Sequence, residues 1–325
     1  MQQVAEGGRA SVGYRRPSSE GSSSERIRSI KRVLWIILFL NLAVALAKIV
    51  WGTISKSSAM QADGFHSIFD GASNVVGLVG MALAGRPADD DHPYGHGKYE
   101  TYASAIIGAM LLLAAYRIGS EAVVSLTGHA EPPTVDAMSF VVMLGTLAVN
   151  VFVTTWERRV GHKLGSSILV ADASHTGSDV LVSLGVIVSL ILVKLGFPIA
   201  DPIVALLVSV AIVYTAWGVF KQASATLSDS ARIPPAEVCA VAMRVPGVMG
   251  CHTIRTRGSE AEVYVDLHVQ VDPESTVAAG HQVAENVERE VATSFGQVVD
   301  VIAHLEPFDD YQRAKTAEET RAGRL

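Results

Sequence analysis

The chain has little charge and almost no cysteine. Of its 325 residues, 18% are charged, against roughly 25% in an average soluble protein, and the mean hydropathy is +0.33. This composition argues against disorder, collagen and a highly charged coiled coil. Cys239 and Cys251 are too few for a disulfide scaffold and fit a reducing compartment. The net charge of -6 gives no indication of nucleic-acid binding, so no nucleic acid is expected as a partner.

Six long apolar stretches follow a polar N-terminal segment. Residues 1–29 are rich in Ser, Gly and Arg and are predicted to form a disordered tail. Each apolar stretch approaches the roughly 20 helical residues that cross a bilayer core. The sequence therefore predicts a six-helix transmembrane domain over residues 30–222, embedded in a lipid bilayer. The stretches lie near 33–52, 59–84, 102–124, 136–156, 167–194 and 200–220.

Basic residues in the short connections predict the orientation. The N-terminal tail is rich in Arg and Lys, the loop after the second stretch holds Arg86 and Lys98, and the loop after the fourth holds Arg158, Arg159 and Lys163. The opposite loops hold few basic residues. Cytoplasmic loops carry an excess of Lys and Arg, so both termini are expected in the cytoplasm.

Residues 229–307 are typical of a soluble α/β segment. From Val263 to Val271, apolar and polar residues alternate, which is the period-2 pattern of a half-buried strand. Helices are expected near 234–244 and 276–294, and further strands near 250–257 and 298–305. The order αββαβ predicts a small two-layer α+β domain. Residues 308–325 are expected to form a polar tail.

Two apolar stretches contain the same pair of ionisable residues. His66 and Asp70, like His175 and Asp179, are four residues apart, so each pair shares one helical face. Ionisable groups within a membrane span are costly and are functional candidates. Two imidazoles and two carboxylates form a ligand set suited to tetrahedral zinc, and protons can replace a departing metal. The alternative is that each pair only holds helices together by hydrogen bonds.

Histidine and carboxylate residues also cluster outside these stretches. Asp89, His92 and His96 converge if the loop turns at Pro93 and Gly95; the alternative is a solvated charge run that orients the next helix. A third set spreads over three expected strands and one helix, so the sequence alone does not bring its members together. That set is His252, His268, His281, His304 and Glu306.

Several motifs together resemble the cation diffusion facilitator family of divalent-metal transporters. The resemblance covers residues 30–307 and is carried by the following segments: ADGFHSIFD at 62–70, the loop 87–98, ADASHTGSDV at 171–180, ADPI at 200–203, PGV at 246–248 and HTIRTR at 252–257. A single H-x-x-x-D pair would not be specific, but the set is.

The resemblance implies a homodimer with six transmembrane helices per protomer and a cytoplasmic ferredoxin-like domain. It implies export of the metal from the cytoplasm in exchange for protons, by alternating access. It assigns His66, Asp70, His175 and Asp179 to the transport site; Asp89, His92 and His96 to a loop metal site; His252, His268, His281, His304 and Glu306 to a binuclear cytoplasmic site near the dimer interface; and Lys98 and Asp229 to a charge interlock between the two domains.

The two-His, two-Asp set is the one associated with zinc in this family, so zinc is the expected metal. Members with Asp in place of His66 tend to accept cadmium, and manganese-type members are richer in carboxylates; iron and cobalt stay open. An intramembrane metalloenzyme is disfavoured because four protein ligands leave no open position for water and because no H-E-x-x-H motif is present. A non-transporting, metal-responsive assembly partner is also disfavoured, because such proteins usually lack a transport-site ligand and all four are present here. The sequence thus predicts a zinc/proton antiporter, not an enzyme, in a bacterial inner membrane.

Overall fold

The computed structural model describes residues 14–15, 19–54, 71–127, 137–195, 197 and 199–321. The chain forms two compact units. The helical unit comprises residues 24–225, and the sheet unit comprises residues 226–325 together with 1–23. His66 and Asp70 lie outside the described residues, as does the first half of the apolar stretch 59–84.

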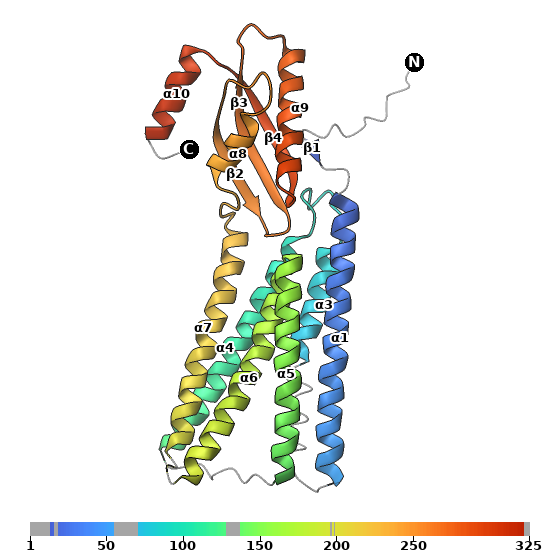
Figure 1. Ribbon diagram of the computed structural model, residues 1–325, viewed down its shortest axis with the longest axis vertical. Coiled ribbons are helices and arrows are strands. Elements are labelled where there is room, and N and C mark those ends of the chain that lie inside the picture. The colour runs from blue at the N-terminus through green and yellow to red at the C-terminus, as the bar shows by residue number, and fades with distance from the viewer. Residues whose placement is uncertain are drawn as a thin grey trace. The chain divides into compact units, whose positions relative to one another are not determined.

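Long helices build the helical unit and run side by side (Figure 1). Three segments are long and apolar enough to cross a membrane: Ser24–Ala47, Lys98–Leu126 and Pro202–Leu227, while Ala72–Ala84 is a shorter apolar helix. Only described residues enter this comparison, and the prediction of six spans stays a prediction. The helices are α1 (Ser19–Ile54), α3 (Ala72–Ala84), α4 (Lys98–Leu126), α5 (Ala137–Leu164), α6 (Ser167–Lys194) and α7 (Ala200–Leu227).

Large apolar side chains cover much of the outside of the helical unit. Phe39, Tyr116, Leu207, Tyr214 and Trp217 are all more than 60% exposed. Soluble monomers rarely expose contiguous apolar patches of this extent. Such a surface is stable in contact with hydrocarbon, so it supports placement of these helices in a membrane.

The core of the helical unit joins α1, α3, α5 and α6. Leu34, Met81, Val153 and Ile168, one from each of these helices, are fully buried in a single hydrophobic cluster. At Gly80, any Cβ would overlap the Cβ of Ala103. Glycine at this position therefore lets the backbones of α3 and α4 approach closely.

Helix α1 begins at Ser19, well inside the segment 1–29 that the sequence predicts to be a disordered tail. Arg26 anchors the first part of this helix. Its guanidinium donates to the carbonyl oxygens of Leu164 (2.6 Å) and Gly165 (2.9 Å) at the end of α5, and to the Glu100 carboxylate (3.0 Å). A cation at a helix C-terminus satisfies carbonyls that lack intrahelical partners. These contacts are long-range and are invisible to local sequence patterns.

The sheet unit contains helix, strand, strand, helix and strand in the order that the sequence predicts. The sheet order is β1-β4-β3-β2, with β3 antiparallel to β2 and parallel to β4. A short N-terminal strand, β1 (Tyr14–Arg15), pairs antiparallel with β4. The remaining elements are α8 (Pro235–Ala242), β2 (Gly250–Gly258), β3 (Val263–Val271), α9 (Val277–Ser294) and β4 (Val298–Pro307).

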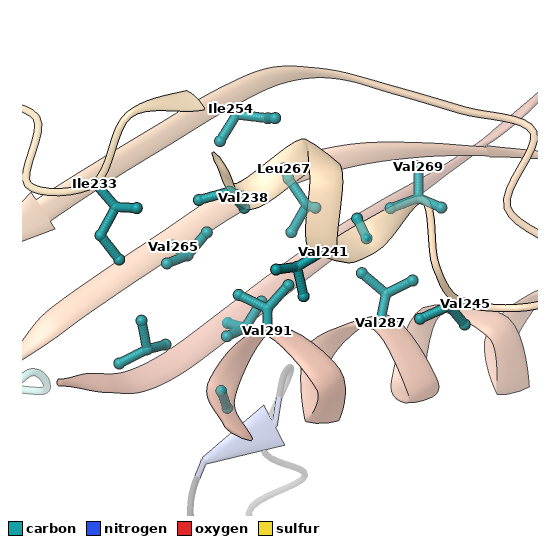
Figure 2. Close-up of a cluster of buried hydrophobic side chains, with 14 of the residues drawn as sticks. Ile233, Val238, Val241, Val245, Ile254, Val265, Leu267, Val269, Val287 and Val291 are labelled. Atoms are coloured by element: carbon teal, nitrogen blue, oxygen red, sulfur yellow. The ribbon is translucent and has the colours of Figure 1, made fainter. Parts of the chain in front are cut away.

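One face of the sheet packs against α8 and α9. Val265, Leu267 and Val269 of β3 are buried in a cluster that includes Val241 of α8 and Val287 of α9 (Figure 2). Because side chains alternate along a strand, the even-numbered residues of β3 lie on the opposite face. His268 is one of them, so the core positions the candidate metal ligands on the face that these helices leave uncovered.

Two features of the sheet unit differ from the sequence-based expectation. Residues 308–325, expected to be a polar tail, contain helix α10 (Asp310–Arg321), whose first turn is capped by the Asp309 carboxylate accepting from the Gln312 backbone N–H (2.8 Å). Cys239 of α8 and Cys251 of β2 form a disulfide, with their Cα atoms 5.9 Å apart. Their separation of 12 residues in the sequence did not predict that they would form a disulfide. The packing of α8 on β2 brings them together.

Candidate metal-binding sites

Helix α6 carries half of the predicted transport site. His175 is 7% exposed, and both of its ring nitrogens are buried without a hydrogen-bond partner among the described residues. Asp179 lies one helical turn further along α6 and is half-buried. A buried polar group without a partner is costly, so a ligand at His175 would satisfy an otherwise unfavourable arrangement. The predicted partners, His66 and Asp70, fall outside the described residues.

A chain of polar side chains joins three helices close to His175. Asn41 of α1 donates to the side-chain oxygen of Asn74 of α3 (2.9 Å), and Asn74 donates to the carboxylate of Asp172 of α6. Asn74 and Asp172 are fully buried. This chain fixes α3, which follows the segment holding His66 and Asp70, against α6, which holds the other predicted pair.

The loop residues Asp89, His92 and His96 do converge. Their ligand atoms lie within 4.8 Å of one another. Asp89 Oδ1 accepts from the His92 backbone N–H (2.7 Å) and lies 3.2 Å from His92 Nδ1, while Asp89 Oδ2 lies 3.4 Å from His96 Nε2. The backbone hydrogen bond from His92, together with the nearby histidines, holds the pKa of Asp89 below its ordinary value, although desolvation opposes this. Gly95 makes the turn, with a φ of 85°.

The orientation of His96 suits metal binding. Its ring is 6% exposed, and Nδ1 lies 3.0 Å from the carbonyl oxygen of Pro87. Because a carbonyl can only accept, Nδ1 carries the hydrogen, which leaves the lone pair on Nε2, the atom that faces Asp89. A histidine ligand held by a carbonyl at its other nitrogen is a common feature of metal sites.

Strand register assembles the third cluster in the sheet unit. His252 of β2 pairs with His268 of β3, and His268 pairs with His304 of β4. Glu306 lies two residues beyond His304 and therefore on the same face. His252, His268 and Glu306 bring ligand atoms within 4.8 Å of one another. Two imidazoles and one carboxylate are donors that suit zinc, so the donor set fits a zinc ion.

Glu306 is the centre of this cluster. Its two oxygens accept hydrogen bonds from His252 Nε2 (2.8 Å) and His268 Nδ1 (3.0 Å), and its side chain is 4% exposed. His304 is peripheral: its Nε2 lies 4.0 Å from Glu306, and its side chain is 64% exposed. His281 of α9 does not join the cluster in this chain and instead pairs with Glu285 on the surface (3.4 Å).

These contacts shift the protonation of the cluster. Burial acts to raise the pKa of Glu306, but the hydrogen bonds from His252 and His268 outweigh it, so the pKa of Glu306 lies below its ordinary value. Burial lowers the pKa of His268, and the hydrogen bond to Glu306 only partly opposes this. Both shifts favour a carboxylate and a neutral imidazole, which are the forms that bind metals.

A bulge in β2 orients His252, and no pattern in the sequence predicted this bulge. The register shifts between His252 and Arg255, and Thr253 has a φ of 49°, an uncommon conformation for a β-branched residue. The bulge brings the Thr253 hydroxyl 2.8 Å from His252 Nδ1. Because Nε2 donates to a carboxylate, the hydroxyl donates to Nδ1; it can turn to accept when a metal takes Nε2. Thr253 is therefore a positioning residue for the cluster.

The predicted charge interlock between Lys98 and Asp229 stays a prediction. Lys98 begins α4 in the helical unit, and Asp229 follows α7 in the sheet unit, with a φ of 53°.

Family models match both units. Residues 34–228 match the cation efflux transmembrane domain, and residues 234–308 match the cytoplasmic domain of cation efflux proteins. The C-terminal unit is therefore the cytoplasmic domain. The first match alone covers more than half of the chain.

Individual relatives agree with these matches. Metal tolerance protein C1 of Arabidopsis thaliana is 30% identical over 311 residues, which make up 90% of this chain but only 64% of that relative's length. A probable cation efflux system protein of Mycobacterium tuberculosis is 32% identical over 291 residues, covering 88% of this chain and 85% of the relative. The manganese efflux system protein MneS of Bacillus subtilis is 27% identical over 273 residues, covering 82% of this chain and 92% of the relative.

The exposed apolar surface of the helical unit and the two family matches agree with the resemblance found in the sequence. The chain belongs to the cation efflux family of divalent-metal transporters, the cation diffusion facilitators.

Proposed function

We propose that this protein is a zinc/proton antiporter that exports zinc from the cytoplasm by alternating access. The observation that carries the proposal is His175, buried with two ring nitrogens that lack a partner in the described structure, one turn from Asp179. Both residues lie within the segment that matches the cation efflux transmembrane domain. His66 and Asp70, which repeat the same spacing, complete the proposed set. The proposed dimer sits in a bacterial inner membrane with both termini in the cytoplasm.

The proposed chemistry follows from charge. Two carboxylates balance one divalent cation, so the loaded site is close to neutral. When zinc leaves, two bare carboxylates would repel each other at low dielectric, and protons take the place of the metal. A neutral imidazole binds zinc, and a protonated one does not. Zinc and protons therefore compete for the same atoms, which is the requirement for antiport.

Manganese is the second candidate for the transported ion. It is favoured by the similarity to a relative that is named as a manganese efflux protein. Imidazole suits zinc, whereas carboxylate and water ligands suit manganese. Because the proposed set contains two imidazoles, zinc is the first choice.

The cytoplasmic cluster is proposed to bind zinc and to stabilise the homodimer. His252, His268 and Glu306 would hold the ion, with His304 at the edge and His281 contributing at most across the dimer. A zinc ion there would supply charge that draws acidic surfaces together; residues 229–325 carry 16 acidic and 9 basic side chains, a net of -7. The loop site at Asp89, His92 and His96 is proposed to capture zinc at the cytoplasmic entrance.

Transport by the purified full-length protein in liposomes tests the proposal. A proton gradient should drive zinc uptake, Asp179→Ala should abolish it, and Glu290→Gln, a change at an exposed position of α9, should leave it unchanged. A panel of zinc, cadmium, manganese, iron and cobalt identifies the ion. Zinc uptake that survives Asp179→Ala would overturn the assignment of the transport site. Uptake of manganese in preference to zinc would overturn the assignment of zinc as the transported ion.

A further inference from the structure

Two acidic side chains meet inside the helical unit without any donor between them. Glu157 of α5 is 0% exposed, and both of its carboxylate oxygens are buried without a hydrogen-bond donor in the described part of the chain. Asp172 of α6 is also 0% exposed, and its Oδ1 lacks a donor in the same way. The two side chains interact directly with each other.

The other oxygen of Asp172 has a defined partner. Asp172 Oδ2 accepts from the side-chain amide of Asn74, and the Ser73 hydroxyl also bonds to this carboxylate. Both partners come from α3. They bond to Asp172 and not to Glu157. Val153 lies one turn before Glu157 on α5, and Ile168 and Leu169 lie about one turn before Asp172 on α6; all three are fully buried in one hydrophobic cluster.

A shared proton supplies a hydrogen bond for two of the three oxygens that lack one. Two adjacent ionised carboxylates in a buried, apolar site repel each other, and each would keep unsatisfied oxygens. Protonation of one carboxyl creates an O–H donor to the other, and a hydrogen bond between an acid and a carboxylate is a strong one. Asp172 is the ionisable group that acts on Glu157. The ring nitrogens of His175 form no hydrogen bond in the described structure, so this histidine supplies no donor to either carboxylate.

We propose that Glu157 and Asp172 form a proton-binding site, distinct from the metal ligands, that shares one proton in this conformation, and that Glu157 exchanges this proton during transport. The second half of the proposal rests on the proposed antiport. The pair joins α5 to α6, and Asn74 extends the connection to α3. A change in the packing of these helices would separate the two carboxyls and release the proton.

Infrared spectroscopy of the full-length protein in lipid tests the shared proton. A buried protonated carboxyl group gives a C=O stretching band that is separate from carboxylate bands and shifts in heavy water. We expect this band at neutral pH in the zinc-loaded protein, whose transport-site carboxylates hold the metal, and its loss in Glu157→Gln, because glutamine supplies the donor and leaves Asp172 ionised. Asp172→Asn should remove the band by the same reasoning, which covers the case in which one variant does not fold. Glu290→Gln should retain it.

The absence of the band in the wild type, or its persistence in both variants, would overturn the shared proton. Loss of the band on adding zinc to Asp179→Ala would overturn the separation of this site from the metal ligands, because a metal would then displace the proton from the pair.

A transport measurement tests the exchange. In liposomes that contain a pH-sensitive dye, Glu157→Gln should still move zinc but should move fewer protons per zinc than the wild type. An unchanged ratio would overturn the exchange. If the wild type moves zinc without protons, the proposed antiport fails, while the infrared result still decides whether the pair holds a proton.

Discussion

His252 Nε2 and Glu306 Oε2 lie 2.8 Å apart although they belong to strands that are not neighbours. Strand β3 separates β2 from β4, and the side chains meet beside His268, which bonds to the other oxygen of Glu306. One carboxylate thus connects three strands on the face opposite the hydrophobic core. The contact depends on the register of both strand pairs.

Removal of Glu306 should destabilise the metal-free protein. Glu306→Ala leaves the buried His252 without its acceptor, and an unsatisfied buried group costs about 1–3 kcal/mol. We expect a loss of this size in denaturant unfolding of the cytoplasmic domain within the full-length chain. Glu290→Ala, at an exposed position, should change stability by less than about 0.5 kcal/mol. Equal stability of the two variants would contradict the role of Glu306.

The cytoplasmic domain should lose stability in acid. The pKa of Glu306 is lowered in the folded state, so its contribution is present above its ordinary value of 4.5 and is lost as the pH falls through the folded value. The pKa of His268 is also lowered, so the unfolded state takes up its proton first as the pH falls below 6.5. Both effects have the same sign. Thermal unfolding in metal-free buffer across this pH range measures the loss of stability. Glu306→Gln should flatten the acid side of the stability profile.

Thr253 should matter for metal affinity more than for stability. Thr253→Ala removes the hydroxyl that bonds to His252 Nδ1, and loss of such an outer partner typically weakens metal binding about 10–100-fold. Calorimetric zinc titration of the full-length protein measures the change. Thr293→Ala, on the exposed side of α9, is the matched control. Affinity equal to that of the wild type would show that the bulge does not serve the metal site.

The loop cluster should bind metal rather than act as a solvated charge run. Asp89→Asn removes the carboxylate that lies near both His92 and His96, so the zinc bound per chain should fall. Asp91→Asn, an equally exposed change in the same loop, should have no effect. Identical zinc stoichiometry in the two variants would favour the charge-run alternative.

Local patterns in the sequence were sufficient for much of the fold. Period-2 alternation from Val263 to Val271 predicted β3, and long apolar stretches predicted the helices, because both patterns reflect how one element meets water or lipid. The spacing of His175 and Asp179 predicted that both lie on one helical face, because residues four apart are about one helical turn from each other. The helical structure from Ser19 was not predicted; Arg26, in the first part of α1, contacts the end of α5, and local patterns do not show such long-range contacts.

The sequence by itself determined the family, the order of elements and the residue types that can bind metal. Tertiary structure decided which of those residues meet: strand register gathers His252, His268 and Glu306 and leaves His281 on the surface. It also decided that Glu157 and Asp172, 15 residues apart on different helices, share one buried site. Long-range packing alone sets such distances and burial, and both the affinity for a cation and the retention of a proton depend on them.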